Sequence, residues 1–153
     1  MSADDVLRGA YDEARDVEAA IDFMRGCPFV DTRRVSIGGH SVGGIVTVIA
    51  AARRRDIAAV VSAAGGITWT QDGVQQGYPA VKALWRVEAP KLTAPVLLLY
   101  GRFDTVVPPE LGSDLAALLN ARGANVTFDV YPGDHGAFPV ASIIAFLDQN
   151  AGK

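Results

Sequence analysis

The sequence predicts an α/β domain in which about four parallel strands are covered by helices on both faces. Short apolar runs alternate with longer amphipathic segments along the 153 residues, and this order is typical of a parallel sheet with helical crossovers. Two of the runs, residues 57–63 and 95–100, contain almost no polar residues, as is usual for strands covered on both faces. Glycine-containing loops follow the runs, at the sheet edge where such folds place their sites. We therefore expect residues 1–153 to form a single domain.

The composition narrows the class of protein. Half of the residues are apolar and 20% are charged, which is ordinary for a globular protein. The net charge of −3 gives no reason to expect nucleic acid or an anionic membrane as a partner, and no stretch has the roughly 18–20 apolar residues of a membrane span. Cys27 is the only cysteine, which excludes an internal disulfide. With an acidic N-terminus unlike a signal peptide, these features favour the cytoplasm.

The first helix is expected to begin at Ser2 or Asp4 and to end near Met24. Gly26 and Pro28 follow it, and neither residue readily continues a helix. Apolar residues recur at steps of three and four, which is the stripe of an amphipathic helix; they are Leu7, Ala10, Ala14, Val17, Ile21 and Met24.

Two strands and a helix come next. The apolar run 35–39 predicts a short strand, and the apolar segment that follows it predicts a helix over residues 42–54. The run 57–63 is expected to be a buried strand, because two glycines close it and its residues are almost all apolar.

Residues 67–94 are the hardest to assign. A short helix over 80–87 is expected within them. Trp69, Tyr78 and Trp85 lie in this segment, which makes it a candidate lid or pocket wall beside a binding site. The alternative is a structured loop whose tryptophans belong to the core.

The last part of the chain repeats the strand and helix pattern. A buried strand over 95–100 precedes a helix that begins after two prolines and ends near residue 121. A strand over 125–131 carries alternate apolar and polar residues, so we expect it to be half exposed. A helix over 139–149 completes the chain.

A serine lies between glycines where the first strand ends. Gly39-His40-Ser41-Val42-Gly43 fits G-x-S-x-G, the sharp strand-to-helix turn that exposes a nucleophilic serine. We expect both glycines to be needed, because a Cβ atom at either position would clash in so tight a turn. The Val42 N–H and the helix dipole then face the charge that develops on a substrate oxygen. The pattern alone also fits an ordinary turn with a surface serine, so an acid and a base are required elsewhere.

An acid and a base follow later strands. Asp104 comes after the strand 95–100 and His135 after the strand 125–131, so both are expected at the same sheet edge as Ser41. Serine is a poor nucleophile without a base within hydrogen-bond reach. His135 can take its proton and return it to the leaving group, while Asp104 holds the imidazole in one tautomer.

Three other side chains compete for these roles. His40 is the only other histidine, but neighbouring residues of a tight turn point in different directions. Asp134 adjoins His135 and is expected to point away from its imidazole. Asp129 is expected on the exposed face of its strand. We therefore expect His135 to be the base and Asp104 to be the acid.

Together the three motifs resemble the catalytic half of the α/β-hydrolase fold, especially its dienelactone-hydrolase-like and prolyl-oligopeptidase-like branches. Residues 39–44 resemble the family's elbow, residues 101–108 its acid loop and residues 134–138 its histidine loop. The resemblance covers nearly the whole chain. Dienelactone hydrolases proper usually have a cysteine nucleophile, so Ser41 points toward the wider group of serine esterases and lipase-like enzymes.

The resemblance also implies a truncated sheet. The family sheet usually has eight strands, and this chain resembles the last four. In the family, the absent half usually supplies a second N–H group of the oxyanion hole. The Val42 N–H is the donor that remains in this chain. The strand 35–39 becomes an edge with unpaired N–H and C=O groups, which proteins avoid leaving bare. We therefore expect a homodimer or larger homo-oligomer that covers this edge.

The expected function is that of a serine carboxylesterase acting on short acyl esters. Ser41, His135 and Asp104 are the expected triad, the Val42 N–H the oxyanion donor, and a small-molecule ester the partner. No metal or organic cofactor is expected. One alternative is a catalytically weak or silent fragment that binds or completes a partner chain. A peptidase of the oligopeptidase type is less favoured, because it needs a propeller or gating domain that the sequence lacks.

Overall fold

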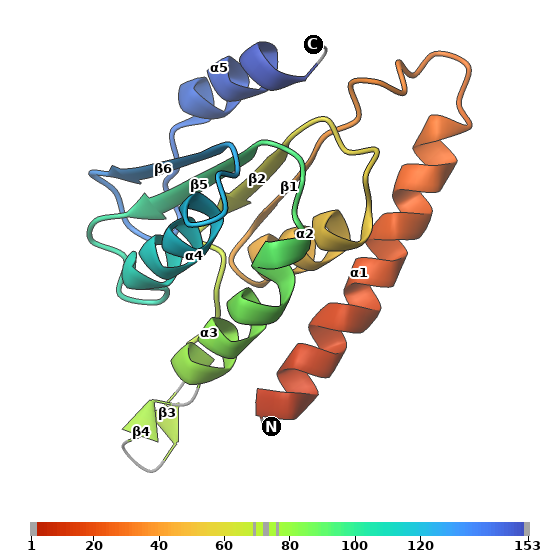
Figure 1. The fold of residues 1–153 in the computed structure, drawn as a ribbon. Helices are drawn as coiled ribbons and strands as arrows, with labels where there is room; N and C mark the ends of the chain where they lie inside the picture. The colour runs from red at the N-terminus through yellow and green to blue at the C-terminus, as the bar shows by residue number, and fades with distance from the viewer. Residues whose placement is uncertain (1–2, 69, 72–73, 76, 152–153) are drawn as a thin grey trace.

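A single four-stranded parallel sheet forms the centre of the molecule (Figure 1). The computed structural model describes residues 3–68, 70–71, 74–75 and 77–151. The strand order is β1-β2-β5-β6, and the strands are β1 (Ile37–His40), β2 (Val60–Ala63), β5 (Val96–Gly101) and β6 (Val126–Tyr131). All three pairings are parallel, so the carboxyl ends of the strands meet at one edge. The predicted fold class is confirmed.

Helices cover both faces of this sheet. Four of them pack on one face and α5 (Val140–Asn150) packs on the other (Figure 1). The four are α1 (Ala3–Arg25), α2 (Val42–Arg53), α3 (Gly77–Glu88) and α4 (Glu110–Asn120). Ser2, one expected helix cap, lies outside the described residues, and Asp4 lies within α1. In the part of the chain that the structure describes, no helix is long and apolar enough to cross a membrane.

The segment after β2 holds more structure than the sequence indicates. A short hairpin, β3 (Thr70–Gln71) with β4 (Val74–Gln75), precedes α3, and a 3-10 turn (Ala89–Lys91) follows it. The helix α3 begins at Gly77 rather than at residue 80. It packs between α4 and the pair α1 and α2, so α3 is part of the body of the domain.

Two hydrophobic cores lie on the two faces of the sheet. The larger core lies between the sheet and the four helices α1, α2, α3 and α4. It includes Ile45, Trp85, Leu98 and Leu115. The smaller core joins β2 and β5 with Phe146 of α5. Every residue of β2 and β5 is buried, as their apolar runs predict, whereas no residue of β6 is.

A partly buried polar contact joins α1 to α3 beside the larger core. The Tyr11 hydroxyl donates to Glu88 Oε1 at 2.6 Å, and Lys91 Nζ lies 3.0 Å from Glu88 Oε2. Glu88 is only 2% exposed. Burial, and then the hydrogen bond to this carboxylate, raise the pKa of Tyr11 to about 12.

Among the described residues, β1 lies at an open edge of the sheet. The Ile37 and Ser41 N–H groups donate to carbonyls of the segment that contains β2, at 3.1 and 2.9 Å. Alternate residues of a strand face opposite neighbours, so the N–H and C=O groups of Gly38 and His40 point to the open side. Half of this strand is glycine, which leaves little side chain to shield it.

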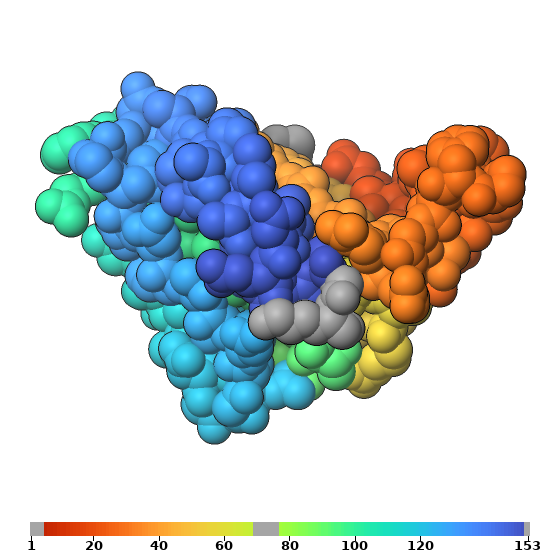
Figure 2. Space-filling view, turned by 90° about the horizontal axis from the view of Figure 1, so that it is seen from above, coloured from red at the N-terminus to blue at the C-terminus, as the bar shows by residue number. Residues whose placement is uncertain are grey.

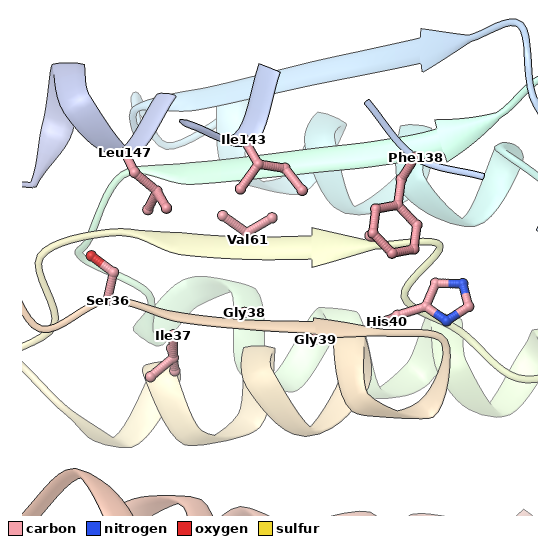
Figure 3. Close-up of a pocket in the computed structure, with 10 residues that line it drawn as sticks. Ser36, Ile37, Gly38, Gly39, His40, Val61, Phe138, Ile143 and Leu147 are labelled. Atoms are coloured by element: carbon pink, nitrogen blue, oxygen red, sulfur yellow. The ribbon is translucent and has the colours of Figure 1, made fainter. Parts of the chain in front are cut away.

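Apolar hollows flank this edge on both sides. Figure 2 shows the surface hollowed between α5 and the segment that follows α1. On the α5 side, a cavity of about 310 Å³ is lined by residues that include Gly38, Val61, Phe138, Ile143 and Leu147 (Figure 3). On the α1 side, a cavity of about 590 Å³ is lined by residues that include Val17, Ile21, Met24, Val30 and Val35. The edge is therefore open on its backbone side and apolar on both faces.

Candidate active site

Ser41 occupies the turn between β1 and α2 in an unusual backbone conformation. Its φ and ψ angles are 57° and −123°, a conformation that costs a residue with a Cβ atom of order 1–3 kcal/mol. Hydrogen bonds over-determine this turn: the Ser41 carbonyl accepts from Gly44 N at 2.9 Å and from Gly66 N at 3.2 Å. The Ser41 N–H donates to the Ala63 carbonyl at 2.9 Å. Ser41 Oγ consequently lies 3.1 Å from His135 Nε2.

The glycines around Ser41 are needed to different degrees. A Cβ atom on Gly39 would lie 2.2 Å from the Gly43 carbonyl oxygen, so only glycine fits there. A Cβ atom on Gly43 would meet nothing within 4 Å, which corrects the expectation that both glycines of the motif avoid a clash. The second crowded position is Gly44, whose Cβ atom would lie 2.6 Å from Gly65 Cα. The close approach of α2 to the loop after β2 therefore depends on Gly44.

The loop after β6 presents His135 to both partners. Its Nδ1 atom lies 2.8 Å from Asp104 Oδ2, and its backbone carbonyl accepts from His40 Nε2 at 2.6 Å. The neighbouring Asp134 turns into its own loop, where Oδ1 accepts from Gly136 N and Ala137 N at 3.0 and 3.2 Å. The structure thus brings Ser41, His135 and Asp104 into one chain of hydrogen bonds and leaves Asp134 outside it.

Asp104 follows β5, and its side chain is fully shielded from solvent. Its Oδ1 atom accepts from Val106 N and Val107 N at 2.8 Å each. These two donors stabilise the carboxylate charge and fix the plane of the group, so that Oδ2 faces the imidazole. The hydroxyl of the buried Tyr100 donates to the Gly65 carbonyl at 2.7 Å. Burial, and to a lesser degree the Asp104 charge, raise the pKa of Tyr100.

A backbone N–H group at the start of α2 follows Ser41 directly. Val42 is the first residue of α2, and a helix leaves its first N–H groups without a partner inside the helix. The positive end of the helix dipole adds to the potential at this point. The turn thus provides an N–H suited to a negatively charged oxygen next to Ser41.

The three aromatic residues expected in a pocket are not brought together by the described structure. Trp69 lies outside the described residues. Trp85 is fully buried in the larger core, which agrees with the alternative that the tryptophans of this segment are core residues. Tyr78 is half-buried between α3 and α4, where its hydroxyl lies 3.4 Å from Asp114 Oδ2. Lys82 Nζ lies 5.1 Å from the centre of the Tyr78 ring.

The described residues show no group of three or more His, Cys, Asp or Glu side chains placed to hold a metal ion.

The start of the candidate lid contacts the acid loop, because the Thr68 hydroxyl donates to the Val106 carbonyl. The N–H group of the same Val106 donates to Asp104 Oδ1. Residues 67–68 therefore lie beside the loop that carries Asp104.

His40 and Gly44 are the site residues that sequence reasoning missed. The sequence shows His40 only as a rival base, since nothing in it reveals that the His135 carbonyl comes within reach. The sequence signal for Gly44 is the double glycine after the serine, of which the motif uses the first. Their functions depend on contacts with loops that are distant in the chain.

Comparisons with known proteins show the family of this chain. The family model for dienelactone hydrolases matches residues 6–151. The chain belongs to the dienelactone hydrolase family. A protein of Methylorubrum extorquens named carboxymethylenebutenolidase is 31% identical over 123 residues, which cover 80% of this chain and 40% of that protein. The chain thus spans about two fifths of the length of this curated relative.

Solved structures of α/β-hydrolases share the fold of this dienelactone hydrolase family member. The esterase Pf2001 of Pyrococcus furiosus superposes with a TM-score of 0.73 at 17% identity, covering 92% of this chain and 62% of that one. A protein of Klebsiella pneumoniae named as a dienelactone hydrolase gives a TM-score of 0.68 at 23% identity, covering 89% and 60%. At such identities the likeness shows the fold alone.

Proposed function

We propose that this dienelactone hydrolase family member is a serine carboxylesterase that cleaves short acyl esters. The observation that carries the proposal is the unbroken set of contacts from Asp104 Oδ2 to His135 Nδ1 at 2.8 Å, and from His135 Nε2 to Ser41 Oγ at 3.1 Å. Nucleophile, base and orienting acid are in the order that acyl transfer requires. The names of the family and of its curated relative support an ester or lactone as the substrate.

The geometry supports a two-step reaction. Ser41 Oγ attacks the ester carbonyl carbon while its proton moves to His135 Nε2, and the Val42 N–H stabilises the negative oxygen. The carbon–oxygen bond to the alcohol then breaks, and the alcohol leaves with the proton from His135. Water attacks the acyl-enzyme after giving a proton to His135, which returns that proton to Ser41 Oγ as the acid leaves.

Short acyl groups are proposed because Tyr78 and Trp85, the two expected pocket residues that the structure describes, make their contacts elsewhere. Trp85 is closed into the core and Tyr78 lies between α3 and α4. Residues 67–68 remain a candidate pocket wall because Thr68 contacts the acid loop. Tyr78 and Trp85 would therefore offer little apolar contact to an acyl chain on Ser41. The binding of short chains depends least on such contact.

The first test is hydrolysis of p-nitrophenyl acetate and butyrate by the wild-type protein and by Ser41→Ala. Turnover that disappears in the variant supports the esterase, and equal slow rates in both proteins contradict it. A fluorophosphonate probe should label the wild type at Ser41 alone, as peptide mass mapping would show. A protein that the probe does not label would favour the second candidate, a silent fragment that completes a partner chain. The open edge of β1 among the described residues favours that candidate.

We also propose that two copies of the chain pair through β1. A strand edge is self-complementary under a two-fold axis, because its outward N–H and C=O groups match those of an antiparallel copy. The apolar cavities on both sides of β1 would be covered in the same step. Light scattering at micromolar concentration should give a mass above 16.1 kDa. Ser36→Lys, which puts like charges at the edge, should shift the mass to the monomer, whereas Ser113→Lys on α4 should not.

The expected surroundings are those of a cytoplasmic enzyme with a small-molecule substrate. Cys27 is a free thiol, which is compatible with a reducing compartment. The net charge of −3 argues against an electrostatic attraction to nucleic acid or to an anionic membrane. Fractionation of the native host would test this placement.

A further inference from the structure

We propose that His40 is a positioning residue for the catalytic base. Its Nε2–H donates to the backbone carbonyl of His135, and this bond holds the imidazole of His135 at the distance from Ser41 that proton transfer requires. The proposal rests on the esterase function of the triad. It gives a role to the residue beside the nucleophile that the motif itself leaves undefined.

The hydrogen bond determines the state of the His40 ring. His40 Nε2 lies 2.6 Å from the His135 carbonyl oxygen. A carbonyl oxygen only accepts, so His40 Nε2 must carry a proton. His40 therefore uses this nitrogen for a structural bond, which is a further reason against its acting as the base.

The ring of His40 is also packed from two sides. Its centre lies 4.6 Å from the centre of the His135 ring and 5.4 Å from that of Phe138. Figure 3 shows the His40 ring at the end of β1, close to the ring of Phe138. His40 thus contacts the histidine loop at two places, on the residue that acts and three residues beyond it.

The contact joins the two edge strands of the sheet. His40 is the last residue of β1, and His135 follows β6, so the bond links the loops of the two outer strands. Other hydrogen bonds of this loop have different effects. Phe103 N donates to the Gly133 carbonyl at 2.9 Å, and Asp134 accepts from its own loop. The Phe103 bond places the loop against the acid loop and the Asp134 bonds hold the loop's own shape, whereas the His40 bond places it against the strand that leads into Ser41.

The expected consequence is a loss of rate rather than a loss of substrate binding. Without the His40 bond, His135 keeps Asp104 but loses its fixed distance to Ser41. A misplacement of about 1 Å can cost a factor of about 100 in rate. Substrate binding does not involve His40 in this proposal, so KM should hardly change.

The experiment compares two substitutions of similar size. His40→Gln keeps an N–H that can reach the same carbonyl, and His40→Leu fills the space without a donor. We expect His40→Leu to lower kcat for p-nitrophenyl acetate by about 10–100-fold, with KM changed less than about twofold. His40→Gln should recover most of the lost rate. Thermal unfolding of both variants checks that they are equally folded.

A second readout does not require activity. The chain has only two histidines, so the ring nitrogens of ¹⁵N-histidine protein give two sets of signals. His40 should appear with its proton on Nε2, and the His135 signals should move in His40→Leu and return toward their wild-type positions in His40→Gln.

The outcomes separate this proposal from the esterase function. Wild-type kcat in a folded His40→Leu variant would overturn the positioning role while leaving the esterase intact. Equal activity in wild type and Ser41→Ala would overturn the esterase instead. The positioning role can still be tested if the esterase is contradicted. His135 signals that do not change in His40→Leu, or a proton on Nδ1 of His40, would overturn it.

Discussion

His135 Nδ1 lies 2.8 Å from the Oδ2 atom of Asp104, whose other oxygen accepts the N–H groups of Val106 and Val107. The carboxylate therefore has one oxygen fixed by the backbone and one left for the imidazole. Because Asp104 is acceptor-only when ionised, the proton of a neutral His135 resides on Nδ1. His135 Nε2 is then unprotonated and faces Ser41 Oγ, as a base must.

Asp104→Asn should therefore lower kcat by about 10³–10⁴-fold with little change in fold. The amide can still accept from the backbone through its oxygen, but its NH₂ group then faces His135 and favours the wrong tautomer. Steady-state kinetics with p-nitrophenyl acetate measure the effect. Asp134→Asn is the matched control, because Asp134 Oδ1 accepts from N–H groups of its own loop. Similar losses in both variants would count against Asp104 as the orienting acid.

The two glycines of the motif should respond differently to alanine. Gly39→Ala places a Cβ atom 2.2 Å from a backbone oxygen, so the turn must shift and stability should fall by about 1–3 kcal/mol. Gly43→Ala meets open space and removes a glycine from the first turn of α2. Its stability should be unchanged or higher by up to about 1 kcal/mol.

Urea unfolding followed by circular dichroism measures both glycine variants. Gly39→Ala should also lose esterase activity, because Ser41 is displaced with the turn, whereas Gly43→Ala should stay active. A stable and active Gly39→Ala protein would show that the elbow adapts to a side chain at this position.

The sequence predicts much of this fold because its local signals agree with the tertiary structure. The apolar runs predict the four strands, and the loops after three of them carry Ser41, Asp104 and His135 at one sheet edge. The periodicity of apolar residues predicts helices and strands but not contacts between loops. The hydrogen bond from His40 to the His135 carbonyl was therefore not predictable. For the same reason an apolar segment alone does not distinguish a core tryptophan such as Trp85 from a pocket residue.

Activity should depend on the protonation of His135 as the base. A protonated His135 cannot accept the Ser41 proton. The rate constant kcat/KM should therefore fall as the pH is lowered and His135 becomes protonated. A pH profile from 5 to 8 with p-nitrophenyl acetate tests this, after subtraction of the rate without enzyme. A flat profile would contradict the role of His135.

The contact between Tyr11 and Glu88 should make stability fall at alkaline pH. The pKa of Tyr11 is raised to about 12 by burial and by the hydrogen bond to Glu88, compared with about 10 in an unfolded chain. The folded state thus holds the phenol proton more tightly, so this contribution is fully present below about pH 10 and is lost as the pH rises toward 12. We expect about 1 kcal/mol, because solvent screens a partly exposed group.

Tyr11→Phe isolates this effect from the other tyrosines and the lysines, which titrate in the same range in both proteins. Free energies of unfolding in urea should differ between wild type and variant by about 1 kcal/mol at pH 8, where the hydrogen bond is intact. The difference should shrink toward zero by pH 12, because ionised Tyr11 no longer donates and is repelled by Glu88. No difference at pH 8 would mean that Tyr11 stabilises the packing of α1 on α3 through its ring alone, and a difference that stayed constant from pH 8 to 12 would contradict the ionisation of Tyr11 as the cause.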